Sequence, residues 1–235
     1  MHYYSKETLE QMADEINRKN YPERLSKMIP FDHYDYMENV LKLDIEWKYL
    51  SPNMKILGLI FFEDGEFYVW PKGSYSKGDI PHKEFFKKGT VVINQAIIDK
   101  KDIEKERFVA NHESMHWIKD IPFFLKIDNS VLQICNKDSF SSTNWNDNMS
   151  AVDIVERQTN YLNAAVLMPR DVIVKEFFKA IRYTFIPVNP IELKKWMYGA
   201  INKIAKAYGV NFNVVKYRLQ DLGIFEREEK YNFKK

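Results

Sequence analysis

Two histidines four residues apart, with a glutamate directly after the first, are the residues of this 235-residue chain best suited to chemistry. His112, Glu113 and His116 form a His-Glu-x-x-His motif inside residues 104–120, a stretch without Pro or Gly. Residues four apart share one face of a helix, so both imidazoles can bind one ion, and nitrogen ligands suit Zn²⁺. Glu113 lies one residue round the helix, where it can take a proton from a water molecule beside the ion. The motif therefore predicts a metal site with Glu113 as general base.

A catalytic zinc site uses three protein ligands and a water molecule, so a third ligand must come from elsewhere in the chain. A predicted helix that ends near Pro169 carries a polar face beside apolar residues, which favours a buried partner. Asp153 and Glu156 are both acidic, lie three residues apart and could share a face, so spacing alone leaves both open. Asn160 follows Glu156 by one turn and could orient a ligand or form an ordinary hydrogen bond between helices.

Two segments resemble the recurring motifs of the ImmA/IrrE metallopeptidases. Residues 107–116 are similar to the pattern Arg-Phe-Thr-x-Ala-His-Glu-x-Gly-His. Residues 156–169 are similar to Glu-x-x-Ala-Asn-x-Phe-Ala-Ala-x-Leu-Leu-Met-Pro. The resemblance implies one Zn²⁺ per chain, with His112, His116 and Glu156 as ligands and Glu113 as the general base.

Several positions depart from the two patterns. Asn111, Thr159 and Asn163 stand where the family has Ala, and Met115 stands where it has Gly. None of these departures removes a proposed ligand or the base. Met115 puts bulk near the metal helix, and we expect this bulk to narrow the cleft and alter substrate preference.

The order of elements predicts an α+β fold of the zincin type, with a small mixed or antiparallel sheet before the metal helix. Helices are expected at residues 5–20 and 31–43. His33, on the second helix, has no partner at ligand spacing and is expected at the surface or in a capping role. Strands at residues 56–62 and 66–70 flank Asp64-Gly65, which predicts a hairpin.

The strand predicted at residues 90–94 arrives just before the metal helix. Metallopeptidases commonly bind substrate as an extended segment at an exposed sheet edge, so this strand is the candidate edge. An interior position in the sheet is an equal alternative. The candidate substrate-binding residues are Val91, Val92, Ile93 and Asn94.

Residues 120–150 separate the metal helix from the next predicted helix, and their second part, from Asn136 to Asn148, is predicted to be a loop because it is rich in Asn, Asp and Ser. Asp138 and Asp147 are metal ligands by type, but nothing fixes their position. Cys135 lies in an apolar run and is expected in the core. A single cysteine excludes an intrachain disulfide and fits the cytoplasm.

The C-terminal part, residues 186–235, is predicted to be a small helical segment packed on a metallopeptidase domain of residues 1–185. Apolar spacing around Gly209 is typical of a helix-turn-helix. Residues 191–235 hold 10 Lys/Arg and 5 Asp/Glu, a net charge of +5, which is too small to require DNA. A structural cap is favoured over DNA binding, which would use Asn211, Asn213, Lys216 and Arg218.

Composition and hydropathy favour a soluble protein. No apolar run approaches the roughly 18–20 residues of a membrane span, and the first residues lack the apolar core of a signal peptide. We therefore expect a cytoplasmic protein without a membrane partner.

Together these observations predict a zinc-dependent endopeptidase. By the resemblance, its substrate is a cytosolic regulatory protein, typically a transcriptional repressor of a mobile element or stress response. The alternatives are a metal-bearing, DNA-binding regulator with little protease activity, and a toxin-like peptidase with another cytosolic target.

Overall fold

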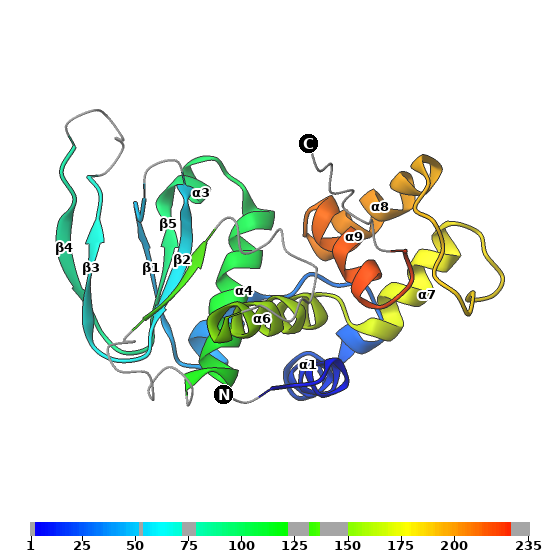
Figure 1. Ribbon diagram of the computed structural model, residues 1–235, viewed down its shortest axis with the longest axis horizontal. Coiled ribbons are helices and arrows are strands. Elements are labelled where there is room, and N and C mark those ends of the chain that lie inside the picture. The colour runs from blue at the N-terminus through cyan, green and yellow to red at the C-terminus, as the bar shows by residue number, and fades with distance from the viewer. Residues whose placement is uncertain (1–2, 52–53, 72–78, 122–131, 137–149, 227–235) are drawn as a thin grey trace.

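The computed structural model describes residues 3–51, 54–71, 79–121, 132–136 and 150–226, with 132–136 described by their backbone. Strands occupy one half of the molecule and most helices the other, with the long helix α4 (Ile103–Lys119) between them (Figure 1). This α+β arrangement with a small mixed sheet confirms the predicted fold class at that level. No helix in the described part of the chain is long and apolar enough to span a membrane.

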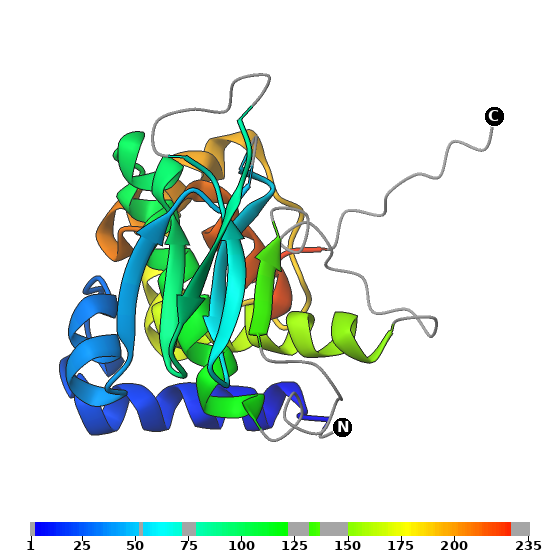
Figure 2. The same cartoon turned by 90° about the vertical axis from the view of Figure 1, so that its left-hand side faces the viewer.

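The main sheet has four strands in the order β1-β5-β2-β6 (Figure 2). β1 is parallel to β5, whereas β5 and β6 are antiparallel to β2. A separate antiparallel pair, β3 and β4, joins the main sheet through a bridge between Tyr49 and Trp70. The strand bounds are β1 Asp44–Lys48, β2 Ile56–Phe61, β3 Gly65–Val69, β4 His82–Phe86, β5 Thr90–Asn94 and β6 Leu132–Asn136.

The predicted hairpin across Asp64-Gly65 is wrong. β2 pairs with β5 and β6, and β3 pairs with β4 instead. The reason lies in burial: β2 is buried from Leu57 to Phe61, on both faces, whereas β3 has a largely exposed surface. A strand apolar on both faces is stabilised in the centre of a sheet, between two covering layers.

The predicted edge position of residues 90–94 is also wrong. β5 lies inside the sheet between β1 and β2, and Val91, Val92, Ile93 and Asn94 are all buried. Both sides of its backbone are used in strand pairing, so no substrate segment can add to it. Within the described residues, the edges of this sheet are β1 and β6.

Helix α4 is buried on two sides, which explains why its sequence lacks a simple amphipathic pattern. Val109 and Ala110 pack in the core under the sheet, while Met115 packs in the helical core. Met115 is fully buried there, so it does not narrow a cleft as expected. Asp102 caps the start of the helix by accepting a hydrogen bond from the Lys105 backbone.

Helix α6 (Ala151–Leu167) lies against both α4 and α1 (Lys6–Asn20). Ser150 and Asp153 form a capping box at its start. At its end, the buried Arg24 guanidinium donates to the carbonyls of Val166 and Leu167, and Pro169 prevents continuation. These contacts hold both ends of the helix that carries Glu156.

The C-terminal helices are part of the same helical core as α1, α6 and α7. α8 ends at Gly209, whose φ of 62° suits glycine, and α9 begins with Asn211 as its cap. The helix-turn-helix assignment and the division at residues 185/186 stay predictions. The remaining helical bounds are η1 Pro22–Leu25, α2 His33–Asp35, the π-helical η2 Tyr36–Val40, α3 Gln95–Asp99, α7 Arg170–Ala180, η5 Lys195–Met197, α8 Tyr198–Tyr208 and α9 Phe212–Asp221.

Candidate metal centre

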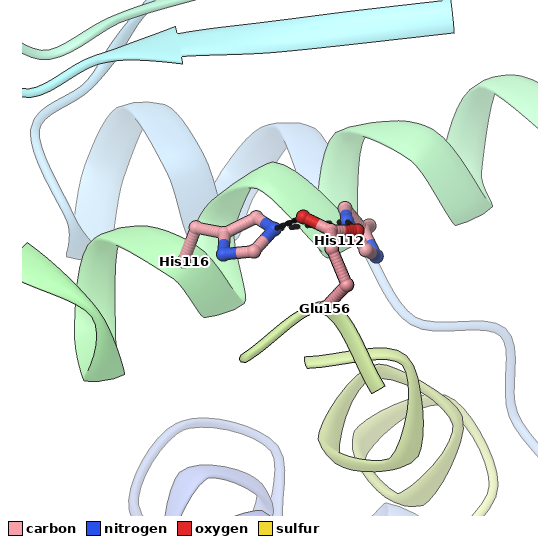
Figure 3. Close-up of side chains that lie close together, drawn as sticks. All are labelled: His112, His116 and Glu156. Carbon is pink, nitrogen blue, oxygen red and sulfur yellow. Dashed lines mark hydrogen bonds and ion pairs between the residues drawn. The ribbon is translucent and has the colours of Figure 1, made fainter. Parts of the chain in front are cut away.

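His112 and His116 lie one turn apart on the same face of α4, and Glu156 reaches them from α6 (Figure 3). The Nε2 atoms of the two histidines are 3.0 Å apart. The carboxylate of Glu156 brings Oε1 to 3.0 Å from His116 Nε2 and Oε2 to 3.4 Å from His112 Nε2. Both imidazoles are fully buried, and Glu156 is 9% exposed. The structure thus brings together two predicted ligands from one motif and the third from the other.

The three ligand atoms fit a small tetrahedral cation. Zinc bonds of about 2.0–2.1 Å in tetrahedral geometry place neighbouring ligand atoms about 3.3 Å apart, close to the distances observed. Among the described residues, this is the group of His, Cys, Asp and Glu side chains that could hold a metal ion. Nitrogen donors with one carboxylate suit Zn²⁺, although other divalent ions accept the same ligands.

The pKa values of these groups reveal a site that attracts positive charge. Burial alone would raise the pKa of Glu156, but the charges and hydrogen bonds of His116 and His112 hold it far below its ordinary value. Burial alone would lower the pKa of His116, but Glu156 and Asp120 raise it to about 9. Burial lowers the pKa of His112. The same nitrogen and oxygen atoms that hold a proton can hold a metal cation. The proton and the cation compete for these atoms, so a site that favours one also favours the other.

Glu113 lies on α4 between the two histidines in sequence and is directed at strand β2. Its Oε1 atom lies 3.0 Å from the position that a Cβ atom on Gly58 would occupy. The Glu113 side chain is fully buried. Because Gly58 has no side chain, the Glu113 carboxylate has room beside β2.

Asp153 and Asn160, the other acidic and polar candidates on α6, have different settings. The Asp153 carboxylate accepts hydrogen bonds from the backbone and hydroxyl of Ser150, in an exposed cap at the helix start. This leaves Glu156 as the acidic group of α6 at the two histidines. Asn160 is half-buried, one turn beyond Glu156, and its role in orienting a ligand stays a prediction. Asp138 and Asp147 lie outside the described residues, as does the side chain of Cys135.

Three residues that the sequence analysis missed surround His116. The Asp120 carboxylate lies 2.7 Å from His116 Nδ1, and the Thr159 hydroxyl lies 3.0 Å from the same carboxylate oxygen. Lys119 Nζ lies 2.5 Å from the other oxygen of Asp120. An aspartate four residues after the second histidine, on the same helical face, was the available signal.

A model of the IrrE N-terminal-like domain, a peptidase family, matches residues 139–220. The match includes Glu156 and the helices α6 to α9, and it begins after the His-Glu-x-x-His motif. It supports the assignment of the chain to the ImmA/IrrE family and thereby a peptidase. No curated protein matches the chain. The family and the His112, His116 and Glu156 group together support a metallopeptidase.

Proposed function

We propose that the chain is a zinc-dependent endopeptidase that cleaves a cytoplasmic regulatory protein. The observation that carries the proposal is the meeting of His112, His116 and Glu156 on two helices, with Glu113 on the same helix as the two histidines. Two histidines and a glutamate are the ligand set of one group of catalytic zinc sites, which keep a position open for water or substrate. The peptidase family match supports the hydrolytic reaction.

Bound Zn²⁺ would supply Lewis acidity toward the scissile carbonyl and lower the pKa of a water molecule. Glu113 would accept the proton of the attacking water and return it to the leaving amine. His112, His116 and Glu156 would hold the ion. Because the Glu113 side chain is buried, its proton transfer would occur in a site screened from bulk water.

The substrate segment is proposed to add to strand β6, in place of the β5 strand favoured by the sequence. Gly58 of β2 is paired with Cys135 of β6, and the same Gly58 faces the Glu113 carboxylate. The β6 backbone therefore runs one strand away from the proposed base. An extended peptide paired with this edge would run two strand spacings, roughly 9–10 Å, from Gly58.

The substrate class is proposed from the family resemblance to be a repressor with a DNA-binding domain, whose cleavage would relieve repression. A DNA-binding function for the chain itself is disfavoured by Arg218, which is 1% exposed and cannot reach a phosphate group. A toxin-like peptidase with another target is distinguished from this proposal by experiment, because it would leave candidate repressors intact.

The proposal is tested by metal analysis of the purified chain and by cleavage of candidate repressors. We expect about one Zn²⁺ per chain, retained in Glu113→Gln but not in Glu156→Ala. Asp153→Ala is the matched control and should retain zinc, because Asp153 caps α6. Glu113→Gln should abolish cleavage, since an amide cannot accept the proton. Activity of metal-loaded Glu113→Gln within a few fold of the parent would remove Glu113 as the base.

A further inference from the structure

The side chain of Asp120 contacts the ring of His116, a contact that is not needed to end helix α4. Asp120 ends α4, yet its carboxylate turns toward the metal-binding face and contacts His116 Nδ1 at 2.7 Å. The side chain is almost fully buried, at 3% exposure of the residue. The opposite ring nitrogen, Nε2, is the atom that faces Glu156 and His112. Asp120 thus contacts Nδ1 of His116, the ring nitrogen that faces away from the other two ligands.

Lys119 forms a buried ion pair with this carboxylate. Its Nζ atom lies 2.5 Å from Asp120 Oδ1 and donates to the Val155 carbonyl at 3.4 Å. The Lys119 side chain has no exposed surface. A buried ammonium beside a buried carboxylate avoids the large cost of either charge alone.

Thr159 provides the third contact, from α6. Its Oγ1 atom lies 3.0 Å from Asp120 Oδ2, 3.3 Å from His116 Nδ1 and 2.9 Å from the Val155 carbonyl. Thr159 is fully buried, and it stands where the resembling motif has Ala. An alanine could not make these contacts, so this part of the arrangement belongs to the present chain.

We infer that Asp120, held by Lys119 and Thr159, is a positioning residue that fixes the His116 ring with Nδ1 protonated and Nε2 directed at the metal. The inference rests on the metal-binding part of the proposed function. A histidine ligand that donates its other N–H to a carboxylate is held in one tautomer and becomes a stronger ligand.

The test is Zn²⁺ affinity of the metal-stripped full chain, measured by competition with a chromophoric chelator. Asp120→Asn alone would leave the Lys119 ammonium buried without its partner, so Lys119→Met and Asp120→Asn are introduced together. This double variant should bind Zn²⁺ roughly 10–100-fold more weakly. Thr159→Val keeps the shape but loses the hydroxyl and should weaken binding in the same direction, and Thr159→Ser should restore it.

Two further measurements separate positioning from general destabilisation. Nitrogen chemical shifts of His116, compared at the same zinc loading, should show an Nδ1–H hydrogen-bonded to a carboxylate in the parent and a changed Nδ1 environment in the double variant. Thr90→Val, a fully buried threonine at the start of β5, is the matched control and should keep the parent affinity. Affinities of the double variant and Thr159→Val within twofold of the parent, with unchanged shifts, would overturn the inference. A parent chain that binds no Zn²⁺ would instead overturn the proposed function.

Discussion

At the scale of single residues, Gly58 and Glu113 define how closely the sheet approaches the metal helix. A Cβ atom on Gly58 would lie 2.6 Å from Val109 Cγ1 and 3.0 Å from Glu113 Oε1. Both distances are too short for a carbon atom to be accommodated without movement. The absence of a side chain at Gly58 is therefore required by the position of the proposed base.

We predict that Gly58→Ala retains zinc but loses roughly 100-fold in kcat/KM, because a displaced Glu113 carboxylate no longer reaches the attacking water. The measurement is kcat/KM with zinc content determined on the same sample. Val109→Ala combined with Gly58→Ala is the control, since it relieves one contact and leaves the other. The double variant should be more stable than Gly58→Ala but no more active. Full activity of Gly58→Ala alone would contradict the prediction.

At the scale of elements, two polar side chains connect α4 to α6 inside the core. Asn111 donates to the Asn163 side-chain oxygen at 2.8 Å, and Asn163 donates to the Phe108 carbonyl at 3.0 Å. Both asparagines are fully buried, and both depart from alanine in the resembling motifs. The two departures thus form one contact, which ties the helix of the two histidines to the helix of Glu156.

We predict that Asn163→Ala lowers the free energy of unfolding by about 1–3 kcal/mol, because it leaves the buried Asn111 amide without its acceptor. Asn111→Ala should cost less, since it also removes an Oδ1 atom that has no hydrogen-bond partner within the described structure. The double variant should cost less than the sum, with a coupling of about 1 kcal/mol. Urea unfolding of all four proteins measures this, and strictly additive effects would show that the contact contributes nothing.

Two polar side chains within the motif-bearing helices α4 and α6 connect these helices to other elements. Arg107 donates to the carbonyls of Phe31 and Gly209, and so joins α4 to the turn before α9. Tyr161 donates to Glu10 on α1 at 2.6 Å. Neither contact belongs to the metal centre.

At the scale of the whole molecule, a buried ion pair joins the C-terminal segment to the first helix. Arg218 of α9 donates to both Glu10 oxygens, at 2.6 and 2.7 Å, and to the Met168 carbonyl at 3.2 Å. Burial alone would raise the pKa of Glu10, but Arg218 and Tyr161 lower it. These contacts span 208 positions of sequence and make the segment part of the core.

We predict that Arg218→Ala lowers the free energy of unfolding by about 3–5 kcal/mol, because the Glu10 carboxylate loses its buried partner. The sequence suggested Arg218 only as a residue that the disfavoured DNA binding would use, and as part of a structural cap its removal was expected to have little effect; its burial against Glu10 corrects that expectation. Lys216→Ala on the same helix is the control and should cost about 1 kcal/mol or less. Thermal and urea unfolding measure both variants, and equal small effects would contradict the burial of Arg218.

The burial of His33 predicts that the free energy of unfolding falls in acid. The side chain is buried rather than exposed as expected, and burial together with Arg107 lowers its pKa from 6.5 to about 4, although Asp32 opposes this. The unfolded chain therefore binds a proton near pH 6.5 that the folded chain refuses until about pH 4. The stability that depends on neutral His33 is complete above pH 6.5 and is lost as the pH falls from 6.5 to 4.

Between pH 6.5 and 4, the protonation of His33 should lower the free energy of unfolding by about 3 kcal/mol. Urea unfolding at a series of pH values measures this change. His33→Phe, which cannot be protonated, should reduce the slope between pH 6.5 and 4, even if its stability at pH 7.5 differs from the parent. An unchanged slope in the variant would assign the acid sensitivity to other groups.

The sequence by itself determined the parts of the site that depend on local geometry. Helical periodicity places His112 and His116 on one face whatever surrounds them, and Ser5 and Pro169 mark ends of helices through interactions with near neighbours. The third ligand needed more, because Asp153 and Glu156 are equivalent in spacing. Only the family resemblance favoured Glu156 before the structure brought it to the two histidines.

The tertiary structure decided everything that depends on which elements become neighbours. It put β5 inside the sheet and β6 at an edge, because strand pairing is set by contacts between segments far apart in the chain. It turned Arg218 from a candidate DNA contact into a buried partner of Glu10. It also brought Thr159 to His116 across 43 positions of sequence. Long-range packing chooses such partners, and a local pattern does not contain them.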